Sequence, residues 1–287
     1  MRVLFPLLLI TLPLFARDPL AQRIAHTDPA KYNQGKNVHK GAGELHYMGL
    51  LDANALNTKF LFLHRGQLQP GGGIGNHFHH TIEEMYVIFN GEAEFTIDGR
   101  TSTLKGPAAA PCKMGQAHAI YNASDKPVEW MNIAVSSVKG KYDNFDTDDD
   151  RVGVPKDPKP VFVNTRFDRA LLRPVENYYG GKGTVHYRRA IPPEVFRTDW
   201  SYIDHLLIPP GSSTGKRVHQ GVEEVYYVMA GSGSVRVNQE TATISKGDAI
   251  PMMLRDEQSL ANHGSEDLEL LIIGVARVKG ALDPPGF

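Results

Sequence analysis

Two things are scarce in this sequence of 287 residues: cysteine, and an excess of charge of either sign. Cys112 is the single cysteine, which excludes an internal disulfide framework and a cysteine-rich zinc site. Any bound metal must therefore be held by nitrogen and oxygen ligands. The 31 basic and 32 acidic side chains leave a formal net charge of -1, so the chain has no positive field that would draw it onto a phosphate backbone. We expect no nucleic-acid partner.

The chain also lacks a hydrophobic run long enough to span a membrane. Its apolar stretch, residues 3–16, is short and is interrupted by Pro6 and Pro13, so we expect no stable membrane insertion. The stretch resembles a secretory signal peptide over residues 1–20, with a small-residue stop at Ala16 or Ala21. This predicts a secreted or periplasmic protein. The alternative is a start site placed too early, in which case the protein would be cytoplasmic.

No stretch shows sustained helical periodicity. Instead, 28 glycines and 19 prolines are spread along the chain in short turn-like clusters, between runs in which apolar residues alternate with polar ones. Asp98-Gly99 lies between two such runs and predicts a hairpin turn. We predict an all-β fold, with strands at residues 61–68, 85–89, 92–97, 128–135, 203–208, 225–229, 234–237 and 268–275.

An internal repeat organises the chain. Many residues recur at a constant offset of 140 positions, which continues from Gly43 to Gly140 without an insertion or deletion. Examples are His79 and His219, Glu84 and Glu224, Gly91 and Gly231, Pro111 and Pro251, and Asn122 and Asn262. Two copies of one structural unit follow from this regularity, an N-terminal copy at residues 21–140 and a C-terminal copy at residues 161–287.

Residues 141–160 lie between the two copies and have the composition of a solvated linker. They contain four aspartates within residues 146–150, followed by three prolines. A calcium loop is the alternative interpretation of the acidic run. The run lacks the spaced oxygen ligands and the glycine of such a loop, so we favour the linker.

The first copy contains a cluster of residue types that bind metals. His77 and His79 are two positions apart, so on a strand both imidazoles project from the same face, and Glu84 follows after a short turn. His118 comes after a glycine-containing bend and would lie on the opposite strand. Two imidazoles and a carboxylate brought to one wall of a barrel form a site for a first-row divalent ion.

Two sequence segments carry a family resemblance. The first is Gly71, His77, His79, Glu84 and Gly91 in the order G-x5-H-x-H-x4-E-x6-G; the second contains the residues Gly106, Pro111, Gly115, His118 and Asn122. Together they resemble the two motifs of the cupin superfamily, and their duplication resembles a bicupin. The spacing of the second segment departs slightly from the commonest one. The resemblance implies two tandem double-stranded β-helix (jelly-roll) barrels.

The same resemblance implies the cofactor and the ligands in the first barrel. It assigns one divalent metal ion, either Mn, Fe, Ni, Cu, Co or Zn, to His77, His79, Glu84 and His118. The segments before each barrel, residues 17–42 and 161–182, are expected to reach across and close the edge strands of the other barrel. The oligomeric state stays open between a monomer and a homo-oligomer.

The second copy differs at the aligned positions, which are occupied by Arg217, His219, Glu224 and Gln258. Arg217 keeps its proton and cannot be a ligand, so we expect no metal there. A substrate-anion grip by Arg217 is one alternative. A structural Arg217–Glu224 salt bridge that replaces the metal is the interpretation that we favour.

Other side chains near the motif have weaker assignments. Strand parity points His80 and Glu83 away from the ligands, which predicts exposed polar residues. Tyr86 shares the face of Glu84, and we name both as catalytic candidates. Several apolar residues could line a substrate cavity: Phe78, Phe89, Phe95, Met114, Tyr121, Trp130 and Met131.

An apolar cavity suits oxygen chemistry on an aromatic or otherwise apolar substrate better than it suits dianionic oxalate. We therefore expect a metal-dependent oxidoreductase of dioxygenase type acting on a small molecule, with Glu84 as ligand and proton acceptor. The first alternative is a non-redox isomerase, lyase or decarboxylase acting on a small sugar or keto/carboxylic acid. The second alternative is a bicupin that binds a small ligand without turnover.

Overall fold

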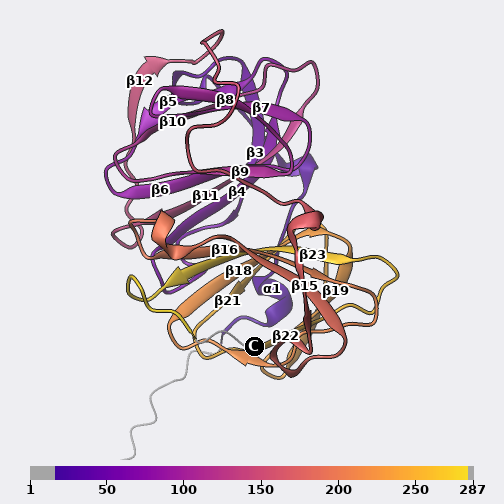
Figure 1. Ribbon diagram of the computed structural model, residues 1–287. Coiled ribbons are helices and arrows are strands. Elements are labelled where there is room, and N and C mark those ends of the chain that lie inside the picture. The colour runs from indigo at the N-terminus through magenta and orange to yellow at the C-terminus, as the bar shows by residue number, and fades with distance from the viewer. Residues whose placement is uncertain (1–16, 284–287) are drawn as a thin grey trace, which may run out of the picture.

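The computed structural model describes residues 17–283 as two β-barrels stacked on each other, which confirms the predicted all-β fold (Figure 1). The first barrel has a seven-stranded and a five-stranded antiparallel sheet. The seven-stranded sheet contains β13 (Thr165–Arg166), β9 (Ala108–Cys112), β6 (Ile82–Ile88), β11 (Val128–Ser136), β4 (Phe60–Leu68), β3 (Glu44–Leu51) and β2 (Asn33–Lys36). The five-stranded sheet contains β12 (Phe145–Asp149), β5 (Gly73–Phe78), β10 (Ala117–Tyr121), β7 (Glu92–Ile97) and β8 (Arg100–Lys105).

The second barrel repeats this plan. Its seven-stranded sheet contains β1 (Ala25–His26), β21 (Asp248–Met252), β18 (Val222–Ala230), β23 (Leu268–Ala276), β16 (Trp200–Ile208), β15 (Thr184–Ile191) and β14 (Arg173–Glu176). Its four-stranded sheet contains β17 (Arg217–Val218), β22 (Glu257–Ala261), β19 (Ser232–Val237) and β20 (Glu240–Ser245). The helical pieces of the described chain are short: α1 (Leu20–Arg23), η1 (Pro29–Lys31), η2 (Val38–Lys40), η3 (Arg169–Leu171), η4 (Tyr178–Gly180) and η5 (Pro193–Val195).

All eight predicted strands are found, and most are longer than predicted. The Asp98-Gly99 turn joins β7 to β8 as expected, because both residues have positive φ, 49° and 75°. A two-residue hairpin turn of this kind needs that conformation, which aspartate and glycine tolerate. Local turn chemistry thus sets the register of this hairpin.

Each barrel is completed by a short strand that precedes the other barrel in the chain. β1 pairs with β21 of the second barrel, and β13 pairs with β9 of the first. In Figure 1 the indigo α1 accordingly lies against the orange-to-yellow barrel. Leu20 and Ile24 bury their side chains in the core of that barrel. The expected crossing of the two leading segments is confirmed, and it covers an edge strand in each barrel.

The two seven-stranded sheets face each other across a continuous apolar core. This core joins residues of β4, β6 and β11 to residues of β16, β18 and β23, and it includes Leu63, Ile133, Trp200 and Ile273. Alternation along each strand explains the arrangement, because one set of side chains fills a barrel and the other set faces the partner barrel.

The expectation that Glu83 is exposed is wrong, whereas His80 is exposed as predicted. The Glu83 carboxylate lies at the interface between the barrels. It accepts hydrogen bonds from the backbone N–H groups of Arg197 and Thr198 and from the Thr198 hydroxyl. Glu223, its equivalent in the repeat, accepts from Thr58 in the same way. Strand parity correctly pointed Glu83 away from the ligands, but the second barrel covers that face of the strand.

The expected linker contains a strand. Residues Phe145–Asp149 form β12, which pairs with β5 and adds an edge to the smaller sheet of the first barrel. Its side chains remain largely exposed, in line with the acidic composition. The correction concerns backbone pairing, which a composition rich in aspartate does not reveal.

The part of the chain predicted as a signal peptide is described only from Arg17 onward. Residues 1–16 lie outside the described residues. Among residues 17–283, no helix is both long and apolar enough to cross a bilayer.

Candidate metal centre and adjoining cavity

The four ligand candidates of the first barrel lie together inside it. One donor atom from each of His77, His79, Glu84 and His118 lies within 4.8 Å of the others, and all four residues are buried. His77 on β5 and His118 on β10 are direct partners in the antiparallel ladder. Glu84 on β6 reaches the cluster from the opposite sheet. The sequence prediction for this cluster therefore matches the geometry.

Hydrogen bonds to the chain orient two of the imidazoles. Nδ1 of His77 donates to the carbonyl of Gly75 at 2.8 Å, and Nδ1 of His79 donates to the carbonyl of Asp143. Both rings therefore turn Nε2 toward the cluster as an acceptor. A second partner of this kind is common behind histidine ligands, since it fixes the tautomer and the ring orientation.

Burial favours the neutral form of His77 and of His118. It lowers the pKa of His77 to about 3 and places the pKa of His118 well below the ordinary value of 6.5. Nδ1 of His118 has no partner within residues 17–283. Its ring stacks on Tyr86, with centroids 4.7 Å apart. Burial also raises the pKa of Tyr86 well above 10, with the Glu84 charge as a further cause.

The cluster fits one divalent cation. His79 Nε2 lies 3.4 Å from His118 Nε2 and 3.5 Å from a Glu84 oxygen, although these atoms would all act as acceptors. Ligands about 2.1 Å from a common ion stand roughly 3.0 to 4.2 Å apart, and nitrogen and oxygen donors of this type suit first-row ions. A cation resolves the mutual repulsion of the donors, so one divalent metal is the cofactor consistent with this site.

The Glu84 carboxylate is also held by the chain. Its Oε2 accepts a hydrogen bond from Asn132 Nδ2 at 2.8 Å. Asn132 lies on β11 directly opposite Tyr86 on β6. The amide therefore fixes the carboxylate from the side of a neighbouring strand.

A cavity of about 300 Å³ adjoins the cluster at Glu84. Its walls are mainly apolar and aromatic, and they include Leu61, Ile74 and Trp130. The polar lining groups are His39, His64, Asn132 and the hydroxyls of Tyr47 and Tyr142, besides Glu84 and Tyr86. A cavity of this size and lining is typical of a site for a small ligand.

Of the apolar residues predicted to line the cavity, Trp130 does so. The other six lie elsewhere. Phe95 packs in the core of the first barrel and Met131 in the core between the barrels. Phe89 lines a different pocket, Phe78 stacks on Phe145, and neither Met114 nor Tyr121 lines this cavity.

Sequence reasoning missed several lining residues, namely His39, His64, Asn132 and Tyr142. His39 stacks on His77 with centroids 3.8 Å apart, and its Nδ1 lies 2.7 Å from Asp146 of β12. The internal repeat contained a signal that could have identified these four residues. The equivalent positions in the second copy hold Tyr179, Asp204, Ile272 and Leu282, so all four residues differ between a barrel with a cavity and one without.

The equivalent space in the second barrel is filled by a hydrogen-bonded network. Arg217 forms a salt bridge with Glu224, as predicted for a structural replacement of a metal. His219, Gln258 and the hydroxyls of Tyr202 and Tyr226 also contact the Glu224 carboxylate. Burial alone would raise the pKa of Glu224, but Arg217 and His219 hold it well below its usual range. The remaining space is about 10 Å³.

Comparison with known proteins agrees with the fold and the motifs. The cupin domain model matches twice, at residues 64–134 and 204–274. An oxalate-binding protein from Thermotoga maritima is 31% identical over 99 residues, which cover 34% of this chain and 82% of that protein. The chain is a bicupin of the cupin superfamily. The expected family is therefore confirmed.

Solved structures share the fold of this bicupin. Bacillus subtilis oxalate decarboxylase, in a study of its Mn(II) centres, has a TM-score of 0.59 and 15% identity over 91% of this chain and 79% of that one. A mutant salicylate 1,2-dioxygenase from Pseudoaminobacter salicylatoxidans, in complex with gentisate, has a TM-score of 0.63 and 16% identity over 88% and 83%. At such identities the similarity establishes the two-barrel architecture alone.

Proposed function

We propose that this bicupin is a metal-dependent enzyme for a small organic substrate, and an oxidoreductase of dioxygenase type. We assign His77, His79, Glu84 and His118 as the ligands of one ion. The observation that carries the proposal is the cavity beside Glu84, whose walls are mainly apolar and aromatic and include neither lysine nor arginine. An apolar or aromatic substrate fits such walls, whereas a small dianion would bring two negative charges beside the Glu84 carboxylate with no lysine or arginine in the lining to offset them.

The residues around the substrate have different roles. When bound, the ion would supply Lewis-acid chemistry and, if redox-active, oxygen chemistry. Leu61, Ile74 and Trp130 hold the apolar body of the substrate and exclude water. Glu84 accepts a proton from the substrate, and Asn132 orients its carboxylate for this step. Tyr86 is the second catalytic candidate, since its ring lies in the same wall.

Non-redox chemistry is the second candidate, and two of the comparisons support it. One relative is named as an oxalate-binding protein, and one structural neighbour is an oxalate decarboxylase. An isomerase, lyase or decarboxylase would use the ion only to polarise a carboxylate or carbonyl group. A bicupin that binds a small ligand without turnover is the third candidate, suggested by the name of the same relative.

Metal analysis of two matched variants tests the site. We expect about one ion per chain in the purified protein. His118→Ala should lose the ion and all turnover while keeping the β-rich circular dichroism spectrum, because the ring lies inside an otherwise complete barrel. Gln258→Ala, at the equivalent position of the second barrel, should keep the ion. Full metal content or full activity in His118→Ala would refute the ligand assignment.

Oxygen dependence then separates the candidates. A dioxygenase should consume oxygen with a phenolic or carboxylic substrate and should contain a redox-active ion. Activity with zinc and without oxygen would support the isomerase, lyase or decarboxylase. Protein that binds a ligand but shows no turnover with any ion would support the binding protein.

We also propose that the chain is exported. Leu20 is 1% exposed and packs in the second barrel, so removal of the leader at Ala16 would preserve this contact, whereas removal at Ala21 would delete it. N-terminal sequencing of protein recovered from the periplasm or the medium tests this. An intact Met1 on cytoplasmic protein would contradict export.

A further inference from the structure

A second cavity lies between the barrels, on the outer side of the wall that encloses the metal site. Its volume is about 660 Å³, roughly twice that of the cavity beside Glu84. Arg65 and Glu129 line it from β4 and β11, while their chain neighbours His64 and Trp130 line the inner cavity. The two cavities therefore share these two strands as a common wall, with one on each face.

The repeat brings equivalent residues of both halves to this inter-barrel cavity. Arg65 and Glu129 form an ion pair in the first barrel. Their equivalents, His205 and Glu269, pair at 2.7 Å in the second barrel. The cavity thus lies where the two halves meet symmetrically.

Each carboxylate of the inter-barrel cavity already has an arginine partner. Glu129 pairs with Arg65, and Glu269 pairs with both Arg169 and His205. Asp168 pairs with Arg166. Lys246 is different, because its ammonium group has no ion-pair partner within residues 17–283. The lining therefore has one positive charge that is not balanced.

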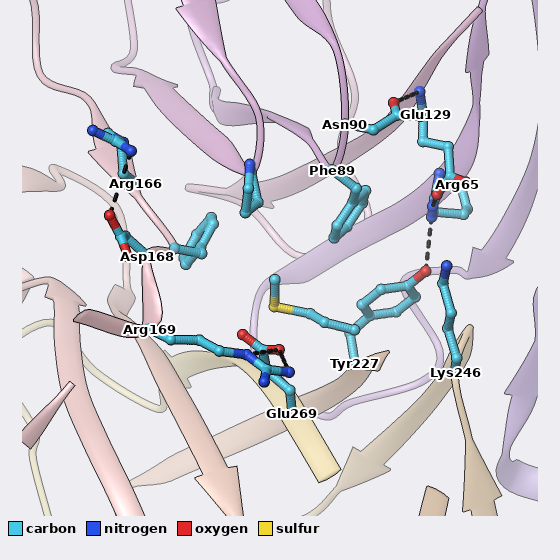
Figure 2. Close-up of a pocket in the computed structure, with 13 residues that line it drawn as sticks. Arg65, Phe89, Asn90, Glu129, Arg166, Asp168, Arg169, Tyr227, Lys246 and Glu269 are labelled. Carbon is cyan, nitrogen blue, oxygen red and sulfur yellow. Dashed lines mark hydrogen bonds and ion pairs between the residues drawn. The ribbon is translucent and has the colours of Figure 1, made fainter. Parts of the chain in front are cut away.

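Two further polar groups offer hydrogen atoms that nothing accepts in the described part of the chain. The Tyr227 hydroxyl accepts from Arg65 Nε at 2.7 Å, so its own hydrogen is free to be donated. The Asn90 side chain accepts through Oδ1 from the backbone of Glu129, which leaves its NH₂ group free. Figure 2 shows Lys246 and the Tyr227 hydroxyl at the same end of the cavity.

The rest of the lining is apolar. Phe89 lies under the Arg65 guanidinium, 4.3 Å from it, and 5.5 Å from the Tyr227 ring. Phe167 and Met229 also line the cavity. The lining therefore combines an apolar floor with donors and one excess positive charge at one end.

We infer that this inter-barrel cavity is a second binding site, which takes a small organic monocarboxylate with an aromatic or branched apolar body. The carboxylate accepts from Lys246 and the Tyr227 hydroxyl, which lie at the same end of the cavity, and the apolar body lies on Phe89 and Met229. None of the three donors of the lining is repeated in the other half of the chain. The equivalents of Lys246, Tyr227 and Asn90 are Gly106, Val87 and Ala230. A ligand is thereby oriented one way on an otherwise symmetric interface.

Titration calorimetry with benzoate tests the site on the full chain. Benzoate should bind saturably, more weakly as salt is raised, and roughly ten- to hundredfold more tightly than neutral benzyl alcohol. Lys246→Gln should weaken benzoate binding by a similar factor. Lys246 is exposed, so this variant folds; Lys182→Gln, another exposed lysine, is the matched control and should bind like the parent. Tyr227→Phe, checked for folding, should weaken binding as well.

A metal-site variant keeps this inference separate from the proposed function. His118→Ala should bind benzoate as the parent does, because the inter-barrel cavity lies on the other face of the wall. Binding that is lost in His118→Ala but unchanged in Lys246→Gln would place the ligand beside the metal and overturn the inference. The absence of benzoate binding, or equal binding of benzyl alcohol, would overturn it too.

Discussion

Glu83 illustrates how a single buried charge can join two barrels. Its carboxylate accepts from two backbone N–H groups and one hydroxyl of the other half. Glu83→Gln replaces an acceptor oxygen by an NH₂ group that faces these donors, so we expect a loss of about 1–3 kcal/mol in the free energy of unfolding. Urea denaturation measures it. Glu92→Gln, an exposed control, should leave the free energy unchanged.

His64 predicts a pH dependence of stability. Burial lowers its pKa from 6.5 to about 4, so the folded protein holds it neutral where the unfolded chain binds a proton. Its contribution to stability is therefore complete above pH 6.5 and is lost as the pH falls to about 4, with a total of at most about 3 kcal/mol. His64→Gln should flatten the decline over this window in urea denaturation. An equal decline in His64→Gln and in the exposed control His263→Gln would contradict this.

At the residue scale, the sequence was sufficient for the ligands and insufficient for their surroundings. Strand periodicity and one turn predict that His77, His79 and Glu84 converge, whereas His118 joined the predicted set through the resemblance to the second cupin motif. His39 and Tyr142 come from segments without a motif, and only the tertiary fold brings them to the cavity.

Among the elements, the segment around β12 closes the first barrel, which contains the cluster of His77, His79, Glu84 and His118. Asp143, just before β12, accepts from the backbone of His80 and from the backbone and hydroxyl of Thr81, and its carbonyl accepts from His79. Asp143→Ala should release this segment and let the His79 ring turn. We expect metal affinity to fall roughly ten- to hundredfold, measured by chelator competition.

The repeat provides a control for that experiment. In the second barrel, the Asp283 carboxylate likewise accepts from the backbone of Gln220, but it also bonds the His219 ring directly, where His79 uses the backbone carbonyl of Asp143. Asp283→Ala should leave the metal affinity unchanged. An unchanged affinity in Asp143→Ala would show that the segment does not support the site.

At the scale of the whole molecule, the shared core predicts that the barrels unfold together. The chain has two tryptophans, Trp130 in the first barrel and Trp200 in the core between the barrels. Single-tryptophan variants, Trp130→Phe and Trp200→Phe, should each show fluorescence and circular dichroism transitions that coincide. Separate transitions in either variant would mean that the halves unfold independently.

The two-barrel architecture could be predicted because a repeat with a constant offset reports whole units, whatever their fold. The details of this architecture could not be predicted from the sequence. β12 looked like a solvated linker because its exposed aspartates carry no apolar pattern, and its backbone pairing leaves no mark on composition. The burial of Glu83 depends on which surface meets the partner barrel, and strand periodicity does not contain that information.

The crossed leading strands have a consequence for synthesis on the ribosome. His26 meets Asp248, which is 222 residues later in the chain. At about 5–20 residues per second, the first segment of the nascent chain waits roughly ten to forty-five seconds for its partner. Strand β9 waits a shorter time for its edge partner β13, because Thr165 follows Ala109 much sooner in the chain. The first barrel can therefore close during translation, whereas the segment at the start of the chain docks only when nearly the whole protein has emerged.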